Sequence, residues 1–159
     1  MKTIIAFADI HGNIFNLMKL IPLIERADYA VFAGDGFSSL EVLPNTVAKK
    51  LTAVKGNCDL FCPLPAEAVL DVGGVRFFIC HGNEYGAKTG NYERIAEAAK
   101  KAGARVALFG HTHKFAQQTV AGVLCINVGA VGTTRTESGG CFVKITVDGN
   151  KINVYNLSI

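Results

Sequence analysis

All four histidines of this chain lie in short motifs that also contain a carboxylate or a glycine. These motifs are Asp9-Ile10-His11-Gly12-Asn13, Cys80-His81-Gly82 and Gly110-His111-Thr112-His113, and two related motifs are Gly34-Asp35 and Gly56-Asn57-Cys58-Asp59. Imidazole is the commonest side-chain metal ligand, and carboxylate and amide oxygens complete mixed nitrogen and oxygen sites. The pattern therefore predicts one metal centre that is assembled from five separate loops.

The motifs supply seven candidate ligands, which are Asp9, His11, Asp35, Asn57, His81, His111 and His113. Ligands two positions apart can converge if the backbone turns, and the neighbouring glycines permit such turns and a close approach to an ion. Seven ligands are too many for one ion with an open position, but they suit two ions that share a carboxylate. Two ions about 3.5–4 Å apart can hold a phosphoryl group and activate a water molecule. Nitrogen and oxygen donors without a thiolate fit Mn, Fe, Co, Ni or Zn.

Strand-like segments precede the three motifs that begin at Asp9, Gly34 and Gly56. Three short apolar runs read as buried strands, namely Thr3–Ala8, Tyr29–Ala33 and Leu51–Val54. Between the first two, Ile14–Arg26 has apolar residues at positions 14, 17, 18, 21 and 24, which predicts a helix with one apolar face. Asn13 is a good N-cap for it, and Pro22 should kink or shorten it. A second helical stretch, interrupted by Pro44, reaches Lys50, so the strands should pair in parallel and bring the motifs to one edge.

The second half of the chain has a different pattern. Gly73-Gly74 separates two apolar runs, as in a hairpin, and Asn91–Ala102 predicts an amphipathic helix with Asn91 as its N-cap. Strands are expected at Ala68–Val72, Val75–Cys80, Arg105–Phe109, Phe115–Val120, Val123–Ile126, Cys141–Val147 and Lys151–Leu157. We therefore expect one α/β domain over residues 1–159, with one sheet built by parallel crossovers and a second sheet that is mostly antiparallel.

Composition excludes several classes of protein. The chain has 159 residues and a net charge of +3, and its basic residues are scattered, so neither membrane binding nor specific nucleic-acid binding is expected. We find no signal peptide and no transmembrane segment. The five cysteines are an odd number and fit reduced thiols in a cytoplasmic protein. Cys58 and Cys62 form a weak zinc pattern that no second cysteine pair supports.

The five motifs in this order resemble those of the calcineurin-like metallophosphoesterase superfamily. The small size of the chain, and Gly-Asn-Cys-Asp in place of Gly-Asn-His-Glu, are similar to the small bacterial and archaeal phosphodiesterase branch. The resemblance runs from residue 1 to about residue 132. It implies an α/β fold of the metallophosphoesterase type, which is an α/β/β/α sandwich of two mixed sheets flanked by helices.

The resemblance also implies a role for each candidate ligand. Metal one would be held by Asp9, His11, Asp35 and His113, and metal two by Asp35, Asn57, His81 and His111. Asp35 would bridge the two ions, and a hydroxide that also bridges them would attack phosphorus in line with the leaving oxygen. The same seven residues are therefore the expected catalytic residues. The family favours Mn(II), although the donor set also fits Fe, Ni, Co or Zn.

Three positions depart from the family pattern. Cys58 occupies the place of a histidine that is thought to protonate the leaving group in larger relatives, and a thiol of ordinary pKa is a poorer proton donor than imidazolium near pH 7. Good leaving groups such as aryl phosphates should therefore be favoured. Asn83 replaces a second histidine near the substrate, and Asn127-Val128-Gly129-Ala130 replaces a more usual Asn-Pro-Gly-Ser loop.

Three functions are compatible with these residues. The first is a dinuclear-metal-dependent phosphodiesterase with a small phosphodiester substrate. The second is a phosphomonoesterase or pyrophosphohydrolase, which would need more cationic contacts than the sparse Lys and Arg near the motifs offer. The third is a metal-binding interaction scaffold, as in a subunit of an endosomal sorting coat with this fold.

The apolar stretch Asp59–Pro65 suggests a contact in a homo-oligomer, and Asp59 itself reads equally as a turn former or as a support for the site. Tyr85, Lys88 and Arg135 are candidate substrate contacts in polar loops.

Overall fold

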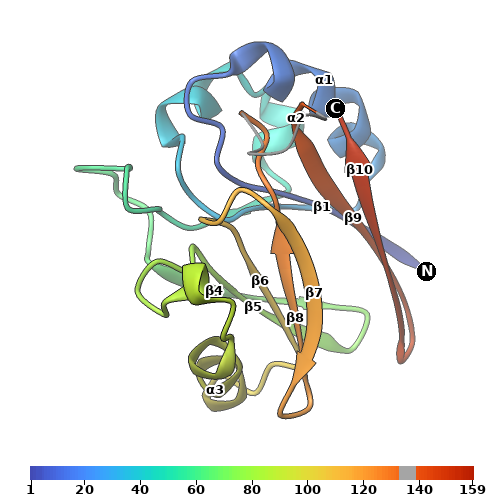
Figure 1. Ribbon diagram of the computed structural model, residues 1–159. Helices are drawn as coiled ribbons and strands as arrows, with labels where there is room; N and C mark the ends of the chain where they lie inside the picture. Colours follow the sequence, from blue (N-terminus) through green and yellow to red (C-terminus); the bar gives the residue numbers. More distant parts are fainter. Residues whose placement is uncertain (133–138) are drawn as a thin grey trace.

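The computed structural model describes residues 1–132 and 139–159, and two five-stranded sheets form its centre (Figure 1). The first sheet contains β1 (Lys2–Phe7), β2 (Tyr29–Phe32), β3 (Leu51–Ala53), β9 (Cys141–Asp148) and β10 (Lys151–Ser158), in the order β10-β9-β1-β2-β3. The second contains β4 (Glu67–Val72), β5 (Val75–Cys80), β6 (Val106–Phe109), β7 (Phe115–Val120) and β8 (Val123–Val128), in the order β4-β5-β6-β8-β7.

Both sheets are mixed. In the first sheet β1, β2 and β3 pair in parallel, while β9 pairs antiparallel with both β1 and β10. In the second sheet β5, β6 and β8 pair in parallel, while β4 and β7 are antiparallel to their neighbours at the two edges. The expectation that the second sheet is mostly antiparallel is therefore wrong, because α3 (Glu93–Lys101) makes a crossover from β5 to β6 and strand β8 returns beside β6.

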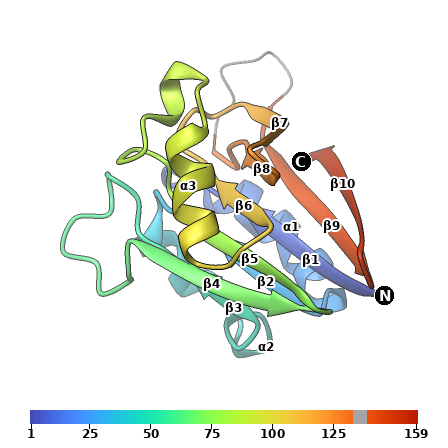
Figure 2. The same ribbon diagram turned by 90° about the horizontal axis from the view of Figure 1, so that it is seen from below.

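The helices cover the outer faces of the sheets (Figure 2). Three helices pack against the first sheet, namely α1 (Ile14–Arg26), the 3-10 helix η1 (Phe37–Val42) and α2 (Asn45–Ala48). The 3-10 helix η2 (Ala87–Thr89) and α3 pack against the second sheet. Apolar residues pack in three clusters: one between the two sheets, one under α1 and one under α3. The resulting α/β/β/α sandwich confirms the expected fold class.

Strand β1 shows why the buried strands read as unbroken apolar runs. Ile4 and Ala6 point into the cluster between the sheets, whereas Ile5 and Phe7 point into the cluster under α1. Successive side chains of a strand point to opposite faces, so a strand buried on both faces needs apolar residues at every position.

Helix α1 begins after Asn13, as expected, and the Asn13 Oδ1 accepts a hydrogen bond of 3.0 Å from the Asn16 N–H. Pro22 does not shorten the helix, which continues to Arg26. The buried residues of α1 are Leu17, Leu20 and Ile24. The expected apolar face was thus partly wrong, because Ile14 and Met18 are 41% and 56% exposed.

Helix α3 starts two residues later than Asn91, and its N-cap is Tyr92. Asn91 still supports the first turn, because its Oδ1 accepts a 2.9 Å hydrogen bond from the Glu93 N–H. No helix within residues 1–132 and 139–159 has the length and apolar character needed to cross a membrane. The cysteines Cys58, Cys62, Cys80, Cys125 and Cys141 are free.

Candidate metal centre

The five motifs all follow the carboxyl ends of parallel strands. Asp9 comes after β1, Asp35 after β2 and Asn57 after β3, while His81 and His111 follow β5 and β6 of the other sheet. The carboxyl ends of parallel strands share one edge of a sheet, and here the edges of both sheets meet. Their loops bring two groups of candidate ligands together, Asp9 with His11 and His113, and Asp35 with His81 and His111, with the ligand atoms of each group within 4.8 Å of one another.

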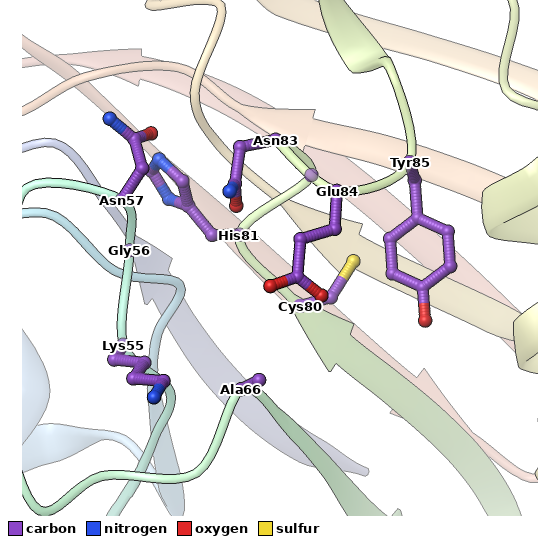
Figure 3. Close-up of a pocket in the computed structure, with 10 residues that line it drawn as sticks. Lys55, Gly56, Asn57, Ala66, Cys80, His81, Asn83, Glu84 and Tyr85 are labelled. Atoms are coloured by element: carbon purple, nitrogen blue, oxygen red, sulfur yellow. The ribbon is translucent and has the colours of Figure 1, made fainter.

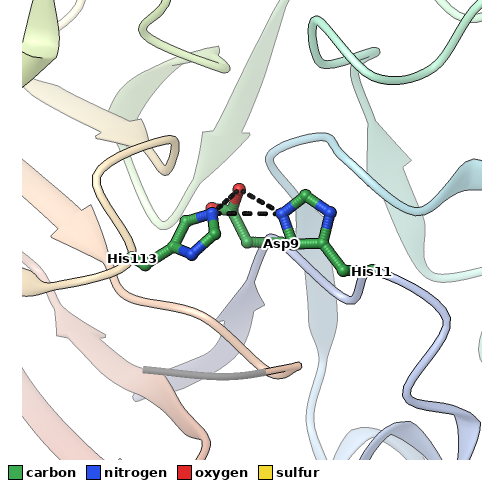
Figure 4. A group of neighbouring side chains, drawn as sticks. All are labelled: Asp9, His11 and His113. Atoms are coloured by element: carbon green, nitrogen blue, oxygen red, sulfur yellow. Dashed lines mark hydrogen bonds and ion pairs between the residues drawn. The ribbon is translucent and has the colours of Figure 1, made fainter. Parts of the chain in front are cut away.

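The first group converges on a carboxylate oxygen of Asp9 (Figure 4). The Nε2 atoms of His11 and His113 lie 3.5 and 3.2 Å from the Asp9 Oδ1 and 3.0 Å from each other. Two ligand atoms that each lie about 2.1 Å from one ion at right angles are about 3.0 Å apart. The three atoms are therefore spaced like one face of a coordination shell.

The second group surrounds Asp35. The His81 Nε2 lies 3.2 Å from the Asp35 Oδ2, and the rings of His81 and His111 are 5.0 Å apart. The groups adjoin, because the Asp35 Oδ2 is also 4.0 Å from the His11 Nε2 and the Asp9 Oδ1 is 3.9 Å from the His81 Nε2. Asp35 therefore lies between the two sets of histidines, as a bridging ligand would.

Two buried polar atoms at the centre have no hydrogen-bond partner, the Asp9 Oδ1 and the His81 Nε2. Buried polar atoms without a partner are rare, and each needs an explanation such as an ion. Both atoms point at the space between the ligand groups, and both are good donors to a divalent cation. The donor set therefore fits metal ions.

The tautomer of His81 is defined by its other ring nitrogen. The His81 Nδ1 lies 2.7 Å from the Ala33 carbonyl oxygen, which can only accept, so Nδ1 carries the hydrogen. In the neutral imidazole Nε2 is then an unprotonated acceptor that faces Asp35 and Asp9. A hydrogen bond of this kind from a ligating histidine to a backbone carbonyl orients the ring and raises its basicity.

Both carboxylates are oriented by backbone N–H groups. The Asp9 Oδ2 accepts a 2.8 Å hydrogen bond from the His111 N–H, and the Asp35 Oδ1 accepts one of 2.8 Å from the Cys58 N–H. In each case the second oxygen, Oδ1 of Asp9 and Oδ2 of Asp35, faces the histidines. The backbone thus holds each carboxylate with one oxygen directed at the centre.

Strained backbone is concentrated at the candidate ligands. Among the described residues that are not glycine, the positive φ angles belong to Asp9, His11, Asp35, Phe61, His111, His113 and Ala121. Non-glycine residues rarely adopt this region, and clusters of such strain mark functional sites. Most of these residues are candidate ligands, so the loops hold an arrangement that the chain would not adopt locally.

Two glycines allow the loops to approach closely. A Cβ atom at Gly56 would lie 2.0 Å from the Asp35 Oδ1, and one at Gly110 would lie 2.6 Å from the Asp9 Oδ2. These contacts are far shorter than van der Waals distance, so any side chain at either position would displace a carboxylate.

Burial and charge together shift the pKa values of the second group. Burial would raise the pKa of Asp35, but the His81 ring 3.2 Å away and the Cys58 N–H together hold the pKa well below its ordinary value. Burial would lower the pKa of His81, but Asp35 and Asp9 raise it. Burial and the neighbouring His81 lower the pKa of His111. Without an ion, these shifts favour opposite charges on the buried side chains of His81 and Asp35.

Asn57 is placed beside His81 at the rim of the centre (Figure 3). Its Nδ2 lies 3.3 Å from the Cys58 Sγ, so its amide nitrogen is turned toward the thiol. Burial and the nearby Asp35 raise the pKa of Cys58, which favours the protonated thiol. Cys58 also forms a close group with His11 and Asp35, whereas none of the close groups among the described residues pairs it with Cys62.

A small pocket adjoins the second group of ligands. Lys55, Asn83, Glu84 and Tyr85 line it together with His81 (Figure 3). The Tyr85 hydroxyl donates a hydrogen bond to Glu67. Lys88 is an exposed residue of the 3-10 helix η2 that follows. Arg135, the third candidate substrate contact, lies outside the described residues.

Sequence reasoning missed the role of Asn127. This buried residue donates hydrogen bonds of 2.8 and 2.9 Å from Nδ2 to the Gly110 carbonyl and the Thr112 Oγ1. Its Oδ1 accepts a hydrogen bond of 3.1 Å from the Gly129 N–H. Asn127 thus fixes the loop that carries His111 and His113, and its signal was a polar residue at the end of an apolar strand.

Known proteins share the sequence pattern and the fold of this chain. A model of the calcineurin-like phosphoesterase superfamily domain matches residues 1–150. The chain is 26% identical over 152 residues to the Bacillus subtilis (strain 168) protein named "Probable metallophosphoesterase YsnB". The match covers 95% of this chain and 88% of that protein. The chain therefore belongs to the calcineurin-like phosphoesterase superfamily.

Solved structures show the same fold. A predicted phosphoesterase from Streptococcus pneumoniae TIGR4 has a TM-score of 0.82 at 21% identity and covers 99% of this chain and 89% of its own. Vps29 from Entamoeba histolytica complexed with Zn²⁺ has a TM-score of 0.74 at 19% identity, and the match covers 98% of this chain and 92% of Vps29. An archaeal phosphodiesterase has a TM-score of 0.70 at 19% identity, and the match covers 98% of this chain and 99% of the phosphodiesterase chain.

Proposed function

We propose that this member of the calcineurin-like phosphoesterase superfamily is a phosphodiesterase that depends on two divalent metal ions. The observation that carries the proposal is the pair of adjoining ligand groups with two unpartnered buried donors, the Asp9 Oδ1 and the His81 Nε2, between them. Buried polar atoms without a hydrogen-bond partner are rare in native proteins, and a bound ion would satisfy both of these. The donor set and the zinc-bound relative of the same fold support metal ions in this place.

In this proposal the two groups hold one ion each. Asp9, His11, Asp35 and His113 would hold the first ion, and Asp35, Asn57, His81 and His111 the second. Bound divalent ions lower the pKa of water to about 7 and neutralise charge on a phosphoryl group. Mn(II) is the ion we propose, since the resemblance to the superfamily favours it, and the donor set also fits Fe, Ni, Co or Zn.

The chain itself supplies orientation and charge. Asp9 and Asp35 bring two negative charges against the four positive charges of two divalent ions, so the centre keeps a net positive charge that attracts a phosphate ester. The backbone bonds to the Asp9 Oδ2 and the Asp35 Oδ1 hold both carboxylates before an ion binds. Such preorganisation avoids rearrangement during the reaction.

The surroundings of the centre favour diesters over monoesters. Lys55 is the one basic residue among those that line the adjoining pocket, and Glu84 lines the same pocket. A monoester carries more negative charge and would need additional cationic donors. The archaeal phosphodiesterase of the same fold supports this choice of substrate.

Hydrolysis of two chromogenic esters tests the proposal. We expect turnover of bis-p-nitrophenyl phosphate to exceed that of p-nitrophenyl phosphate with added Mn(II), to disappear with a chelator and to return with metal. The Asp35→Asn variant should fold and bind metal weakly but lose turnover by orders of magnitude. Equal activity of this variant and the wild type would refute the proposal, and faster turnover of the monoester would correct the substrate class.

An interaction scaffold is the second candidate. The loop Asp59–Pro65 is tucked under the fold only at Leu64, which packs against the cluster under α1, whereas Leu60 and Phe61 are 76% and 104% exposed. Exposed apolar side chains of this size suit a contact with another copy or another protein. A chain that binds two ions, hydrolyses no ester and elutes as an oligomer that Phe61→Ser dissociates would favour this candidate.

We also propose that the protein works in the cytoplasm. The five free thiols suit a reducing compartment, where disulfides do not persist. Fractionation of cells that express a tagged chain would test this, and recovery outside the cytoplasmic fraction would contradict it.

A further inference from the structure

The carboxylate of Asp59 accepts four backbone hydrogen bonds. Its Oδ1 accepts from the N–H groups of Gly36 and Phe37, and its Oδ2 from those of Asp35 and Gly56, each at 2.8 Å. A turn former would need only a local contact, and Asp59 has one between its own N–H and the Gly56 carbonyl. The four side-chain bonds therefore require a different explanation.

Three of the four donors are consecutive. The N–H groups of residues 35, 36 and 37 converge on one carboxylate, and the backbone φ angles of Gly34, Asp35 and Gly36 are +93°, +63° and +133°. Successive N–H groups that form a concavity make an anion-binding site known as a nest. In this chain the anion is the side chain of Asp59, which we call the nest anion.

The nest anion also joins two ligand loops. Its Oδ2 is shared between the N–H of Asp35, after strand β2, and the N–H of Gly56, after strand β3. A further hydrogen bond joins the same two loops, because the Cys58 N–H donates to the Asp35 Oδ1. Asp35 is thus held through its backbone by Asp59 and through its carboxylate by Cys58.

We propose that Asp59 is a positioning residue of the metal centre, and that it acts by filling the nest that holds Asp35 in its left-handed conformation. This inference rests on the proposed function, because it concerns the ligand that lies between the two proposed ions. It has a distinctive consequence: the nest is built from backbone donors, so it survives the loss of the Asp59 side chain. A small carboxylate from solution can then replace the missing one.

The test is metal binding by Asp59→Ala, measured by calorimetric titration with Mn(II) with and without sodium formate, with sodium chloride at equal ionic strength as the salt control. We expect the affinity of at least one ion to fall about 10- to 100-fold and formate to restore most of the loss. Turnover of bis-p-nitrophenyl phosphate, if present, should follow the same pattern, with the loss mainly in kcat.

Asp28→Ala is the matched control. Asp28 also accepts a backbone hydrogen bond, from the Thr3 N–H at 2.9 Å, but its other oxygen pairs with Lys2, so these two partners lie in β1 and outside the ligand loops. We expect its metal affinity to equal that of the wild type, with no response to formate. A response of the control or of the wild type would show that formate acts elsewhere.

Three results would overturn the inference: unchanged metal binding in Asp59→Ala, a loss that formate does not restore, or an equal loss in Asp28→Ala. If Asp59→Ala does not fold alone, formate must restore the fold, and failure to do so contradicts the inference equally. The proposed function is judged separately, since a wild type that binds two ions but hydrolyses no ester refutes the enzyme and leaves the metal-binding test of Asp59 intact.

Discussion

The two ligand groups of the centre differ in burial and in how the chain holds them. The side chains of His11 and His113 are 32% and 19% exposed, whereas those of His81 and Asp35 are 1% and 3% exposed. His81 is also oriented by the Ala33 carbonyl, and Asp35 by the Cys58 N–H. Both groups have a buried, oriented carboxylate, but the second adds a buried, oriented histidine, His81, whereas the first has two partly exposed histidines; we call them the buried and the open half-site.

This difference suggests a division of labour. A ligand that is already oriented loses little freedom when it binds an ion, so the buried group should bind its ion more tightly. The open group has room for solvent and substrate beside its ion, so its ion should exchange more readily. Four predictions test this comparison, in order of the expected effect.

The largest effect is expected from the residue that both groups share. Asp35→Ala removes the carboxylate between the His81 and His11 rings and should lower the number of tightly bound Mn(II) ions from two to one or none. Turnover should fall by about 1,000-fold or more, since a two-ion site loses its common ligand. Calorimetric stoichiometry measures the first result and a diester assay the second. Two ions bound with wild-type affinity would show that Asp35 does not bridge.

A smaller but still large effect is expected at Gly56. A methyl group in Gly56→Ala would collide with the Asp35 Oδ1, which a Cβ would approach to 2.0 Å, and should destabilise the fold by about 1–3 kcal/mol and weaken the buried half-site. Gly86→Ala is the control, because φ at Gly86 is +70° but nothing lies within 4 Å of a Cβ there. Urea unfolding and metal titration of both variants separate the collision from simple backbone strain. Equal effects of the two variants would contradict a close approach at Gly56.

The two histidines should respond unequally to removal. His81→Ala deletes a buried, oriented ligand, and His11→Ala deletes a partly exposed one, so we expect the greater loss of metal affinity, by about 10-fold, in His81→Ala. Titration of both variants with Mn(II), together with circular dichroism to confirm the fold, measures the ratio. A greater loss in His11→Ala would reverse the assignment of the tight half-site.

The smallest effect is a change of sign in the pH dependence of stability. The pKa of His81 is raised in the metal-free fold, so its contribution is complete below the ordinary value of about 6.5 and is lost as pH rises through its folded pKa. The pKa of Asp35 is lowered, so its contribution to the stability of the fold is lost only below about pH 3.8. The pKa of His111 is also lowered, so its contribution is lost as pH falls below about 6.5. From neutral pH upward, His81 therefore determines the trend.

We expect the free energy of unfolding of the chelator-treated protein to fall as pH rises above about 6.5. The metal-loaded protein should become more stable over the same range, because neutral imidazole is the metal ligand. Thermal unfolding at several pH values, with chelator and with Mn(II), measures both slopes. The same slope in both states would mean that His81 does not exchange a proton for an ion.

The sequence predicted the strands well, and placed the candidate ligands directly after them, for one physical reason. Strands buried on both faces are continuous apolar runs, and each run here ends at a motif, so β1, β2 and β3 and the residues after them could be read directly. Strand direction in the second sheet could not, because apolar runs carry no sign of parallel or antiparallel pairing. Helix α1 was found, but spacing alone included the exposed Ile14 and Met18 in its buried face.

The supporting contacts of the centre were less accessible to sequence reasoning. The left-handed backbone of Asp9, His11 and His113 depends on distant loops, and no residue type marks it. The partners of Asp59 are backbone N–H groups, which every residue except proline possesses, so its sequence was compatible with a simple turn. Asn127 likewise bonds to a carbonyl in another motif.

The most direct test of the account is a titration of the metal-free chain with Mn(II) that records bound ions and hydrolysis of bis-p-nitrophenyl phosphate in the same samples. The account predicts two ions per chain, a tight one followed by a weaker one, with turnover appearing only as the second binds. Saturation at one ion with full turnover would contradict a two-ion centre, and two bound ions without turnover would contradict the enzyme.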